Sequence, residues 1–383
     1  MSFELVICGA GPAGLSTAIF AARAGLKAVV LEKMGETGVF PRGETMRPDP
    51  VIDELLGAGF MDSISFNRTP WRRFWSPGAR ESFEFAREDS SYIFHWKDLT
   101  EGLRKVAESE GVEIRFNSEV AAPLVSDGHC TGVVLKDGTR VEGASVVAAD
   151  GHRSVLTSGV DHERINCPIA KRICHGIRSD FEGMEFFIIP PGSVEPDFPA
   201  ALAFIFPRGG GDAEVGFSII SGGLSGKQRK NMPADDRMLP FLQKLFEEYP
   251  VFSDRVGAAE ISFEGYSLIP MGGLHHEAME VPGLILSGDT IGMVEATGGC
   301  GIVPCMKNAR FIVDFILKHN PRSWDDVMMK TYNREFAESE IRKMIAGKYR
   351  KMLPLMRLLF SRRYKDKTYA RMWGLVKRLK GKP

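Results

Sequence analysis

The sequence predicts an α/β fold, an α+β composite in which an antiparallel β-sheet interrupts a parallel-stranded domain and a helical tail follows. Three observations support this prediction. A strand pattern, a glycine-rich turn and a helical run follow one another in the first 25 residues. Short aromatic strands separated by proline and glycine breakers occupy the middle of the chain. A buried-strand pattern that ends in Gly-Asp returns near residue 285 and precedes a long helical segment.

The N-terminal segment has the pattern of a Rossmann-like βαβ unit. A strand over 3–8 is followed by Gly9, Gly11 and Gly14 in the spacing G-x-G-x-x-G, then by a helix and a second strand over 27–31. In such units the first glycine permits a tight turn, the second lets a pyrophosphate approach the backbone, and the third lets the helix pack closely on the strand. The segment therefore predicts a dinucleotide site. The alternative is a glycine-rich turn that closes an ordinary βαβ unit.

Two further features of this segment favour a dinucleotide. A helical run over 15–25 follows the turn, and its N-terminus offers free N–H groups and a partial positive charge to phosphates. Glu32 follows the second strand, where a carboxylate can accept hydrogen bonds from ribose hydroxyls.

The next elements continue the strand-and-helix alternation. A helix over 96–111 leads into a strand over 112–116. An Asp-Gly turn within 136–139 joins two alternating runs and predicts a β-hairpin. A buried strand over 145–149 ends at Asp150, in the sequence Ala-Asp-Gly-His-Arg-Ser.

Two aromatic zones, within residues 66–96 and 186–217, differ in character from the rest of the chain. Their short strands predict an antiparallel sheet, and chain continuity implies that this sheet is inserted into the nucleotide-binding domain. Most of these aromatic side chains are expected to be core. A few are expected to line an apolar pocket between the domains, where ligand sites tend to lie.

The pattern of the first domain returns with a strand over 283–287 that ends at Gly288-Asp289. A glycine-rich loop over 298–301 and a helix over 302–318 follow. The remainder from residue 321 is predicted to be helical, with a break at Pro354 because proline lacks the N–H that a helix needs.

The formal net charge of zero conceals a strong asymmetry. Residues 342–383 contain 15 Lys or Arg and one acid, Asp366, whereas the rest of the chain contains 34 basic and 48 acidic residues. Lys and Arg mixed with Trp, Met and Leu favour peripheral contact with an anionic membrane surface. The alternative is that the tail packs on the acidic body of the protein. Nucleic acid is not expected as a partner, because no recognised binding module accompanies the charge.

Other classes are disfavoured by composition. No apolar run reaches the roughly 18 residues of a membrane span, and no basic region precedes the first strand as it would in a signal peptide. We therefore expect a cytoplasmic protein. The six cysteines do not form a disulfide framework, and their spacing gives no metal site.

Taken together, three separated motifs resemble those of FAD-dependent oxidoreductases of the para-hydroxybenzoate hydroxylase fold. They are Gly9–Gly14 with Glu32, Ala149–Ser154, and Gly288-Asp289 with its glycine-rich loop, and the resemblance covers most of residues 1–320. Within that fold the segment Gly-Asp-Thr-Ile-Gly-Met-Val, followed by Gly-Gly-Cys-Gly-Ile, is similar to the geranylgeranyl reductase family. The hydroxylase branch usually has a His after Gly-Asp and then Gly-Gln-Gly-x-Asn.

Two segments depart from the reductase pattern. The strand that ends in Phe204-Ile205-Phe206-Pro207 is similar to the Tyr-x-Trp-x-Phe-Pro strand of that family, but Leu202 and Phe204 replace the Tyr and the Trp. The segment 40–48 lacks the Cys-Gly pair of many reductases and looks more like the Arg- and Glu-bearing loop of hydroxylases and halogenases. No Trp-x-Trp-x-Ile-Pro segment of a halogenase is present.

The resemblance implies FAD as the cofactor and a discontinuous FAD-binding domain over 1–75, 95–157 and 265–320. The inserted substrate domain then covers 76–94 and 158–264, and a basic helical region covers 321–383. The implied cofactor-binding residues are Gly9, Gly11, Pro12, Ala13, Gly14, Glu32, Lys33, Arg42, Lys97, Ala121, Asp150, Gly288, Asp289, Gly299, Gly301 and Ile302.

The resemblance also implies a reaction. Reduced flavin would transfer hydride to a C=C bond of an isoprenoid or other hydrophobic substrate, in a pocket that includes Phe204 and Phe206. The loops that carry Glu44, Glu295 and Cys300 are expected to approach the flavin ring, which makes these residues the candidate proton donors. Each has a structural alternative: an ion pair for Glu44, a solvated loop position for Glu295 and simple packing for Cys300.

The electron donor stays open. Only one dinucleotide fingerprint is present, so electrons would come from NAD(P)H bound transiently or from another carrier. Two other functions also stay open: a flavin-dependent monooxygenase or halogenase acting on a hydrophobic or aromatic substrate, and a non-enzymatic flavin-binding lipid carrier.

Overall fold

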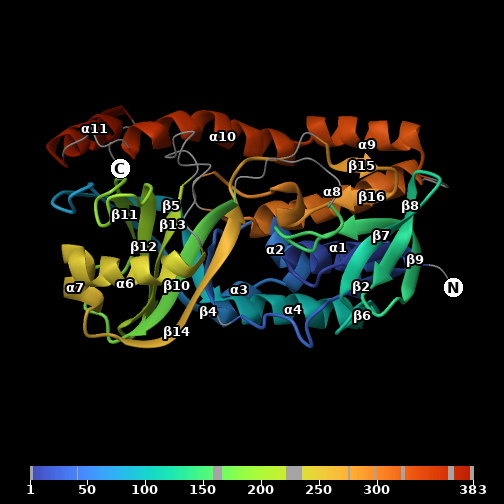
Figure 1. The fold of residues 1–383 in the computed structure, drawn as a ribbon, viewed down its shortest axis with the longest axis horizontal. Helices are drawn as coiled ribbons and strands as arrows, with labels where there is room; N and C mark the ends of the chain where they lie inside the picture. Colours follow the sequence, from blue (N-terminus) through green and yellow to red (C-terminus); the bar gives the residue numbers. More distant parts are fainter. Residues whose placement is uncertain are drawn as a thin grey trace.

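A computed structural model describes the fold of this chain over residues 3–40, 42–157, 166–220, 235–274, 277–296, 299–320, 324–360 and 366–379. Its elements form two sheets at opposite ends of the molecule, and the C-terminal helices run along one side of both (Figure 1).

The first sheet is built around parallel strands. Its order is β15 (Met279–Val281), β16 (Leu284–Leu286), β9 (Arg140–Ala148), β1 (Phe3–Cys8), β2 (Ala28–Leu31) and β6 (Glu113–Arg115), with β7 (Val120–Ser126) and β8 (His129–Leu135) attached through β9. The pairs β16–β9, β9–β1, β1–β2 and β2–β6 are parallel, and β1 and β2 are almost entirely buried runs of Val, Ile and Leu. The predicted hairpin is confirmed, because β8 and β9 pair antiparallel across the Asp-Gly turn.

Helices cover this sheet and complete its core. Helix α1 (Pro12–Arg23) lies against both α4 (Trp96–Ser109) and α8 (Ile302–His319), and the shorter α2 (Pro50–Leu56) and α3 (Phe60–Ile64) pack beside α4. Ten of the twelve residues of α1 are buried, and this explains its weak amphipathic pattern in the sequence.

The second sheet carries the aromatic zones and is antiparallel except for one pair. Its order is β14 (Glu260–Pro270), β10 (Asn166–His175), β13 (Asp212–Ile219), β12 (Ala201–Gly209), β11 (Met184–Ile189), β4 (Ser65–Trp75), β5 (Ser82–His95) and β3 (Gly43–Met46). Only β11 and β4 among these described strands pair parallel. The strands β3 and β4 therefore belong to the second sheet, although the sequence division placed residues before 76 with the nucleotide-binding part.

The two faces of the second sheet have different neighbours. Side chains alternate between faces along each strand. Phe187, Ile205 and Phe217 point to the face covered by η2 (Asp235–Arg237), α6 (Met238–Glu248) and α7 (Pro250–Val256), where they form a core with Phe241 and Phe252. Phe204 and Phe206 consequently point to the opposite face.

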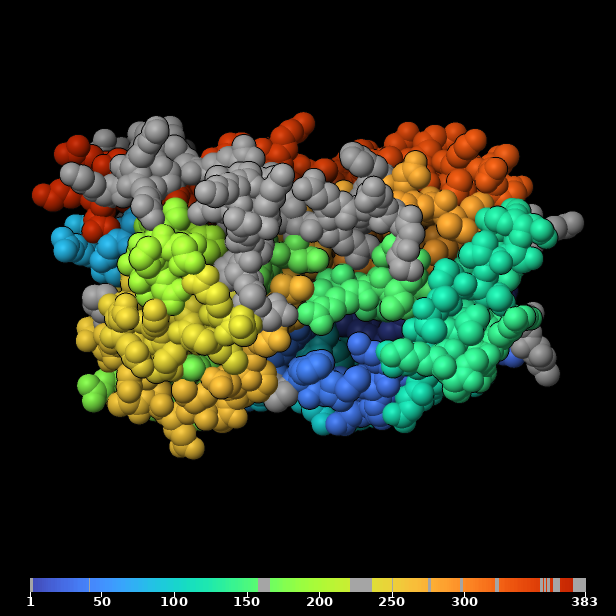
Figure 2. Space-filling model, in the orientation of Figure 1, coloured from blue at the N-terminus to red at the C-terminus, as the bar shows by residue number. Residues whose placement is uncertain are grey.

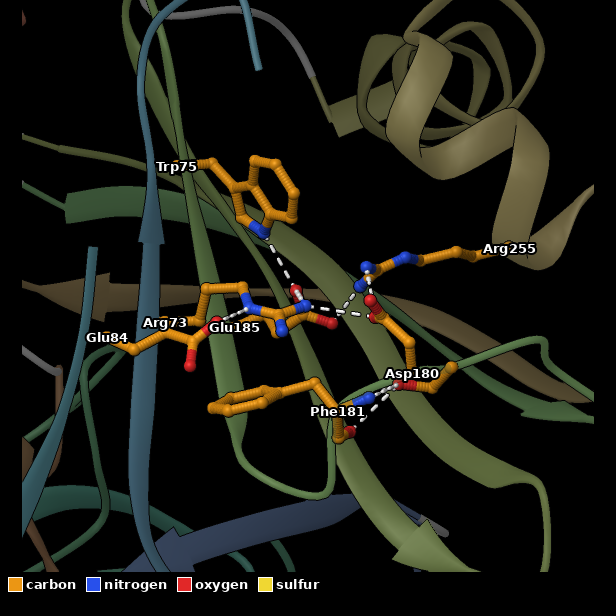
Figure 3. A network of polar contacts seen from close by, with 8 residues as sticks. Arg73, Trp75, Glu84, Asp180, Phe181, Glu185 and Arg255 are labelled. Carbon is orange, nitrogen blue, oxygen red and sulfur yellow. Dashed lines mark hydrogen bonds and ion pairs between the residues drawn. The ribbon is translucent and has the colours of Figure 1, made fainter. Parts of the chain in front are cut away.

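A network of buried charges reinforces the helix-covered face (Figure 3). The Glu185 carboxylate is 1% exposed and forms ion pairs with Arg73 of β4 and Arg255 of α7, and the indole Nε1 of Trp75 donates to it over 2.7 Å. The Arg255 guanidinium also pairs with Asp180 at 2.8 Å. The network thus joins β4, β11 and α7, and its members compensate one another's charge.

The C-terminal region forms three helices that connect the two ends of the molecule (Figure 1). They are α9 (Asp326–Glu338), α10 (Glu340–Leu359) and α11 (Asp366–Leu379). Ile345 of α10 is buried in the core of the first sheet, whereas Met356 is buried in a separate cluster against the second sheet. The predicted break at Pro354 was wrong, because α10 continues through this proline. Packing of the following turn, which includes Met356 and Phe360, compensates for the missing backbone hydrogen bond.

Helix α11 is fixed to the second sheet at its first turn and along one side. The Asp366 Oδ1 atom accepts a hydrogen bond of 2.7 Å from the Gly78 N–H group, between β4 and β5. The Trp373 ring stacks on Phe83, with ring centroids 4.6 Å apart. Among the described residues no helix has the length and apolar character needed to cross a bilayer.

Candidate cofactor-binding site

The three motifs found in the sequence meet at one edge of the first sheet. Gly9 follows β1, Glu32 follows β2, Asp150 lies just beyond β9, and Gly288-Asp289 follows β16 as the 3₁₀ turn η3 (Gly288–Ile291). These four strands are neighbours and parallel, so their carboxyl ends share an edge. Ligands of open α/β sheets bind at this edge.

Close packing holds the motifs together. A Cβ atom on Gly9 would lie 2.4 Å from the carbonyl oxygen of Ala149, and Gly9 has a φ of +105°, which also requires glycine. A Cβ atom on Gly288 would lie 2.8 Å from the Cβ atom of Ala13. The Thr290 hydroxyl accepts from the Gly151 N–H group at 3.1 Å and lies 3.3 Å from the Asp150 Oδ1 atom. Each motif therefore contacts the other two.

Gly11 and Gly14 have opposite surroundings, as the fingerprint requires. A Cβ atom on Gly14 would lie 1.9 Å from the carbonyl oxygen of Gly9, so only glycine allows α1 to pack this close to β1. At Gly11, no atom of the described residues lies within 4 Å of the position that a Cβ atom would take. Gly11 is the N-cap of α1, and the first turn contains no acidic residue. An open space thus faces the N-terminus of a helix, and this arrangement fits a pyrophosphate.

Glu32 is oriented toward the same turn. Its Oε2 atom accepts a hydrogen bond of 2.8 Å from the Ala10 N–H group, and its Oε1 atom accepts one of 2.9 Å from Met34 N–H. These bonds fix the carboxylate beside the glycine turn, and each oxygen retains a lone pair for a ribose hydroxyl.

The opposite end of the site is formed by Asp289 and the N-terminus of α8. A Cβ atom on Gly301, the N-cap of α8, would lie 3.3 Å from the Asp289 Oδ1 atom. Burial raises the pKa of Asp289 to about 6, with Arg42 acting in the opposite direction. Burial thus disfavours the ionised form of this carboxyl, and titratable groups perturbed in this way are typical of ligand sites. Gly298 of the predicted loop lies outside the described residues.

A hollow in the surface accompanies this edge. In Figure 2 it lies between the segment that follows β9 (green) and the blue segment near α2, and the N-terminal part of the chain (dark blue) forms its floor. The residues present therefore fit an extended dinucleotide that contacts Glu32 at one end and Asp289 at the other.

The remaining predicted cofactor residues lie around this edge with different contacts. The Arg42 guanidinium lies 4.1 Å from the centroid of the Trp96 ring, and its Nε atom is 3.1 Å from Glu44 Oε1. Lys97 forms an exposed ion pair with Glu36 at 3.3 Å. Lys33 and Ala121 are exposed, and Ala121 lies on β7, whose approach is fixed by a Ser118 N–H bond to the Glu32 carbonyl oxygen. Their contact with a cofactor stays a prediction.

The three candidate proton donors share one neighbourhood. Burial raises the pKa of the Cys300 thiol to about 11, and the carboxylates of Glu44 and Glu295 add to this effect, which places both near it. Glu295 is ion-paired with Lys348 of α10 at 2.5 Å and lies 3.7 Å from Arg47. Glu44 is likewise paired, with Arg42. Of the three side chains, Cys300 is the one without a cationic partner among the described residues, and its thiol is protonated at neutral pH.

The sequence interpretation missed a buried cation beside Glu44. The Lys171 Nζ atom lies 2.8 Å from Glu214 Oε1 and 3.6 Å from Glu44 Oε1, and it donates to the carbonyl oxygen of Gly43 over 3.1 Å. Burial disfavours its ammonium, but Glu214 and Glu44 outweigh burial and raise the pKa of Lys171. The sequence feature that could have indicated this buried cation is the lysine that ends the apolar run in Cys-Pro-Ile-Ala-Lys.

The site-facing side of the second sheet is largely aromatic. The Phe204 and Phe206 rings stack with centroids 4.4 Å apart, Phe206 contacts Phe186, and Phe186 stacks on Phe74 at 4.8 Å. Ile269 of β14 comes within 3.3 Å of a Cβ atom built on Gly299. This face of the second sheet therefore adjoins the glycine-rich loop of the cofactor edge through Ile269.

Comparison with known proteins agrees with this geometry. Residues 2–168 match a family model described as an FAD binding domain. A digeranylgeranylglycerophospholipid reductase of Haloferax volcanii is 26% identical over 321 residues, which cover 81% of this chain and 74% of that protein. A menaquinone reductase of Mycobacterium tuberculosis is 26% identical over 358 residues, or 88% of this chain and 82% of that protein.

A solved structure extends the similarity to the whole fold. The crystal structure of a geranylgeranyl bacteriochlorophyll reductase-like protein from Thermoplasma acidophilum superposes with a TM-score of 0.79 at 18% identity, covering 98% of this chain and 91% of that one. The glycine turn, the acid after β2, the Gly-Asp turn and these similarities lead to one conclusion: the chain is an FAD-dependent oxidoreductase that carries an FAD-binding domain over residues 2–168 and is similar to geranylgeranyl reductases of the para-hydroxybenzoate hydroxylase fold.

Proposed function

We propose that this enzyme reduces C=C bonds of an isoprenoid or similarly hydrophobic substrate. The observation that carries the proposal is the junction between the cofactor edge and the aromatic face, at Gly299 and Ile269. An apolar wall beside a redox cofactor suits a substrate that offers little besides hydrocarbon to bind. The names of the relatives, which include reductases of an isoprenoid lipid and of menaquinone, support the same substrate class.

The bound FAD would supply the electron pair, and the chain would do the rest. Gly11 and the α1 N-terminus would hold the pyrophosphate, Glu32 a ribose, and Asp289 with the α8 N-terminus the other end of the cofactor. The aromatic face would orient the substrate and exclude water. We assign proton donation to the Cys300 thiol, because Glu44 and Glu295 are each held in an ion pair.

Saturation of one double bond consumes two electrons and two protons, so the cofactor must be reduced again after each turnover. The electrons would come from NAD(P)H or another carrier that binds transiently, since the sequence has one dinucleotide fingerprint. The division into an FAD-binding domain, an inserted substrate domain and a basic helical region is part of the same proposal, with β3 and β4 moved to the substrate domain.

The basic C-terminal region is proposed to make peripheral contact with an anionic membrane. Tyr369 and Trp373 of α11 face the protein, whereas Lys367 and Arg371 are exposed on the same helix. Each exposed basic residue near an anionic leaflet adds about 1 kcal/mol to binding. This placement would let an apolar substrate pass from a bilayer to the aromatic face.

Anaerobic photoreduction tests the reaction class. The purified FAD-loaded protein is reduced under argon, and polyprenyl lipids are then added in detergent. Recovery of the oxidised flavin spectrum with a saturated product is expected, and detergent without polyprenyl lipid serves as the blank. Reoxidation only when air is admitted would contradict the proposal and indicate an oxygen-dependent reaction. Addition of NADPH or NADH before the lipid identifies the electron donor.

A further inference from the structure

An ion-paired cluster interrupts the apolar face that adjoins the cofactor edge. On β10 and β13, Lys171 and Glu214 point to the same side as Phe204 and Phe206, as the strand register shows. Their side chains are 14% and 2% exposed. Burial of a lysine and a glutamate among aromatic rings is costly, and replacing such a pair by apolar residues is often neutral or stabilising. Stability alone therefore does not explain the pair.

Glycines and aromatic rings surround Lys171 in the sheet. Its neighbours across the sheet are Gly216 on β13 and Gly265 on β14, and the rings of Phe204 and Phe263 lie 2.8 Å from the positions that Cβ atoms on these glycines would take. The same cluster specifies Gly43 on β3, because a Cβ atom there would overlap the Glu214 carboxylate. The second sheet thus brings β3, from its opposite end in strand order, against β10 and β13.

The cluster extends toward the cofactor edge through one residue. Glu44 lies 3.6 Å from Lys171 and is near both Cys300 and Asp289, as its effect on their titration shows. Glu295 keeps Lys348 and Arg47 as partners whether or not Lys171 is present. Without Lys171, however, Glu44 and Asp289 would share Arg42 as their cation. Lys171 therefore offsets charge at the position where the cofactor ring is expected.

We propose that Lys171 is a positioning residue that holds Glu44 and offsets its negative charge, and that this makes the bound FAD easier to reduce. The inference rests on the proposed FAD site. Uptake of two electrons and one proton gives the cofactor one additional negative charge. A cation that neutralises the adjacent carboxylate stabilises that charge, and its effect is large in a site from which water is excluded.

Four variants test the proposal through the reduction equilibrium of bound FAD, measured at pH 8 against a redox dye during anaerobic photoreduction. Lys171→Met is expected to lower the equilibrium constant about tenfold, which is about 30 mV for a two-electron couple. Glu214→Gln removes the opposite charge and should raise this equilibrium constant. The double variant restores the charge balance and should return within about threefold of the unmodified protein. Lys171→Arg should retain most of the effect.

A matched control separates charge from stability. Arg255→Met removes a cation from the buried network on the opposite face of the same sheet (Figure 3). It should lower thermal stability without moving the reduction equilibrium. If Lys171→Met does not bind FAD, Glu214→Gln still tests the proposal, because it is expected to raise the equilibrium constant for FAD reduction.

Two outcomes would overturn the proposal: a shift under threefold in Lys171→Met, or shifts of equal sign in Lys171→Met and Glu214→Gln. Neither outcome depends on an alkene. Failure of the proposed reaction would instead appear as reduced flavin that no polyprenyl lipid reoxidises, and failure of the proposed site as a protein that binds no FAD at all.

Discussion

Gly11→Val separates cofactor binding from folding more sharply than any other single substitution in this site. Gly11 has φ −82° and ψ −179°, a conformation that valine adopts readily, and no described atom lies within 4 Å of its Cβ position. The new Cβ atom therefore meets no described part of the protein. Loss of a glycine N-cap costs at most about 1 kcal/mol, so the apoprotein should remain folded with nearly unchanged stability.

The same side chain would fill the space in front of the α1 N-terminus. Hydrogen bonds from N–H groups to a charged phosphate contribute about 1.5–3 kcal/mol each. Loss of two of them amounts to about 3–6 kcal/mol, so FAD affinity should fall by roughly two to four orders of magnitude. Quenching of flavin fluorescence during titration measures the affinity, and urea unfolding of the apoprotein measures the stability.

Gly14→Ala provides the contrast. Its Cβ atom would lie 1.9 Å from the Gly9 carbonyl oxygen, a backbone atom that cannot move without displacing the turn. Overpacking of this kind costs about 1–3 kcal/mol or more, so this variant should lose stability before any cofactor is added. The assignment of the glycines would be refuted if Gly11→Val bound FAD normally, or if Gly11→Val unfolded while Gly14→Ala did not.

Three further outcomes are expected. Burial raises the pKa of Asp289 to about 6 from 3.8, so the apoprotein should lose stability as pH rises from about 4 to about 6. Asp289→Asn should remove this loss, which is worth up to about 3 kcal/mol at pH 7. Identical urea midpoints for the variant and the unmodified protein at both pH 4 and pH 7 would contradict this expectation. With its pKa raised to about 11, Cys300 should react with iodoacetamide about tenfold faster per pH unit between pH 7 and pH 10. A rate that levels off near pH 9 in peptide mass spectrometry would show that the pKa of the thiol is not raised. Trp373→Ala removes the stacking on Phe83 and should speed trypsin cleavage within α11 about tenfold, a loss of about 1.4 kcal/mol in docking. Unchanged cleavage would mean that Asp366 and Tyr369 hold the helix without this stacking.

The cofactor half of the site could be predicted from sequence because its determinants are local. A turn glycine, the helix that follows it and the acid after β2 all lie within 32 residues, and each imposes a residue type through backbone geometry. The Gly-Asp turn was recognisable for the same reason. Strand periodicity likewise predicted the antiparallel character of the second sheet.

The features that escaped prediction depend on pairing between distant segments. The parallel pair β4–β11 joins residues more than 100 positions apart, and periodicity does not indicate partners. The contact between Lys171 and Glu44 brings β3, the last strand of the second sheet, against β10 near the other end of the strand order, and no local sequence pattern indicates this contact. The continuation of α10 through Pro354 was missed because packing of Met356 and Phe360 overrides a local rule.

This difference in origin has a functional consequence. A Cβ atom at Gly9, Gly14 or Gly288 would lie 2.8 Å or less from a neighbouring atom, so substitutions there should abolish the cofactor site or the fold. The cluster of Lys171 and Glu214 is made of side chains, so its charge can change while the strands stay in register. The two effects should therefore be separable in this enzyme. Variants in the glycine turn should weaken binding of oxidised and reduced FAD equally and leave the potential unchanged, whereas variants in the cluster should change the affinity for reduced FAD and thereby move the potential. A glycine-turn variant that also moved the potential would mean that the two halves of the site are coupled.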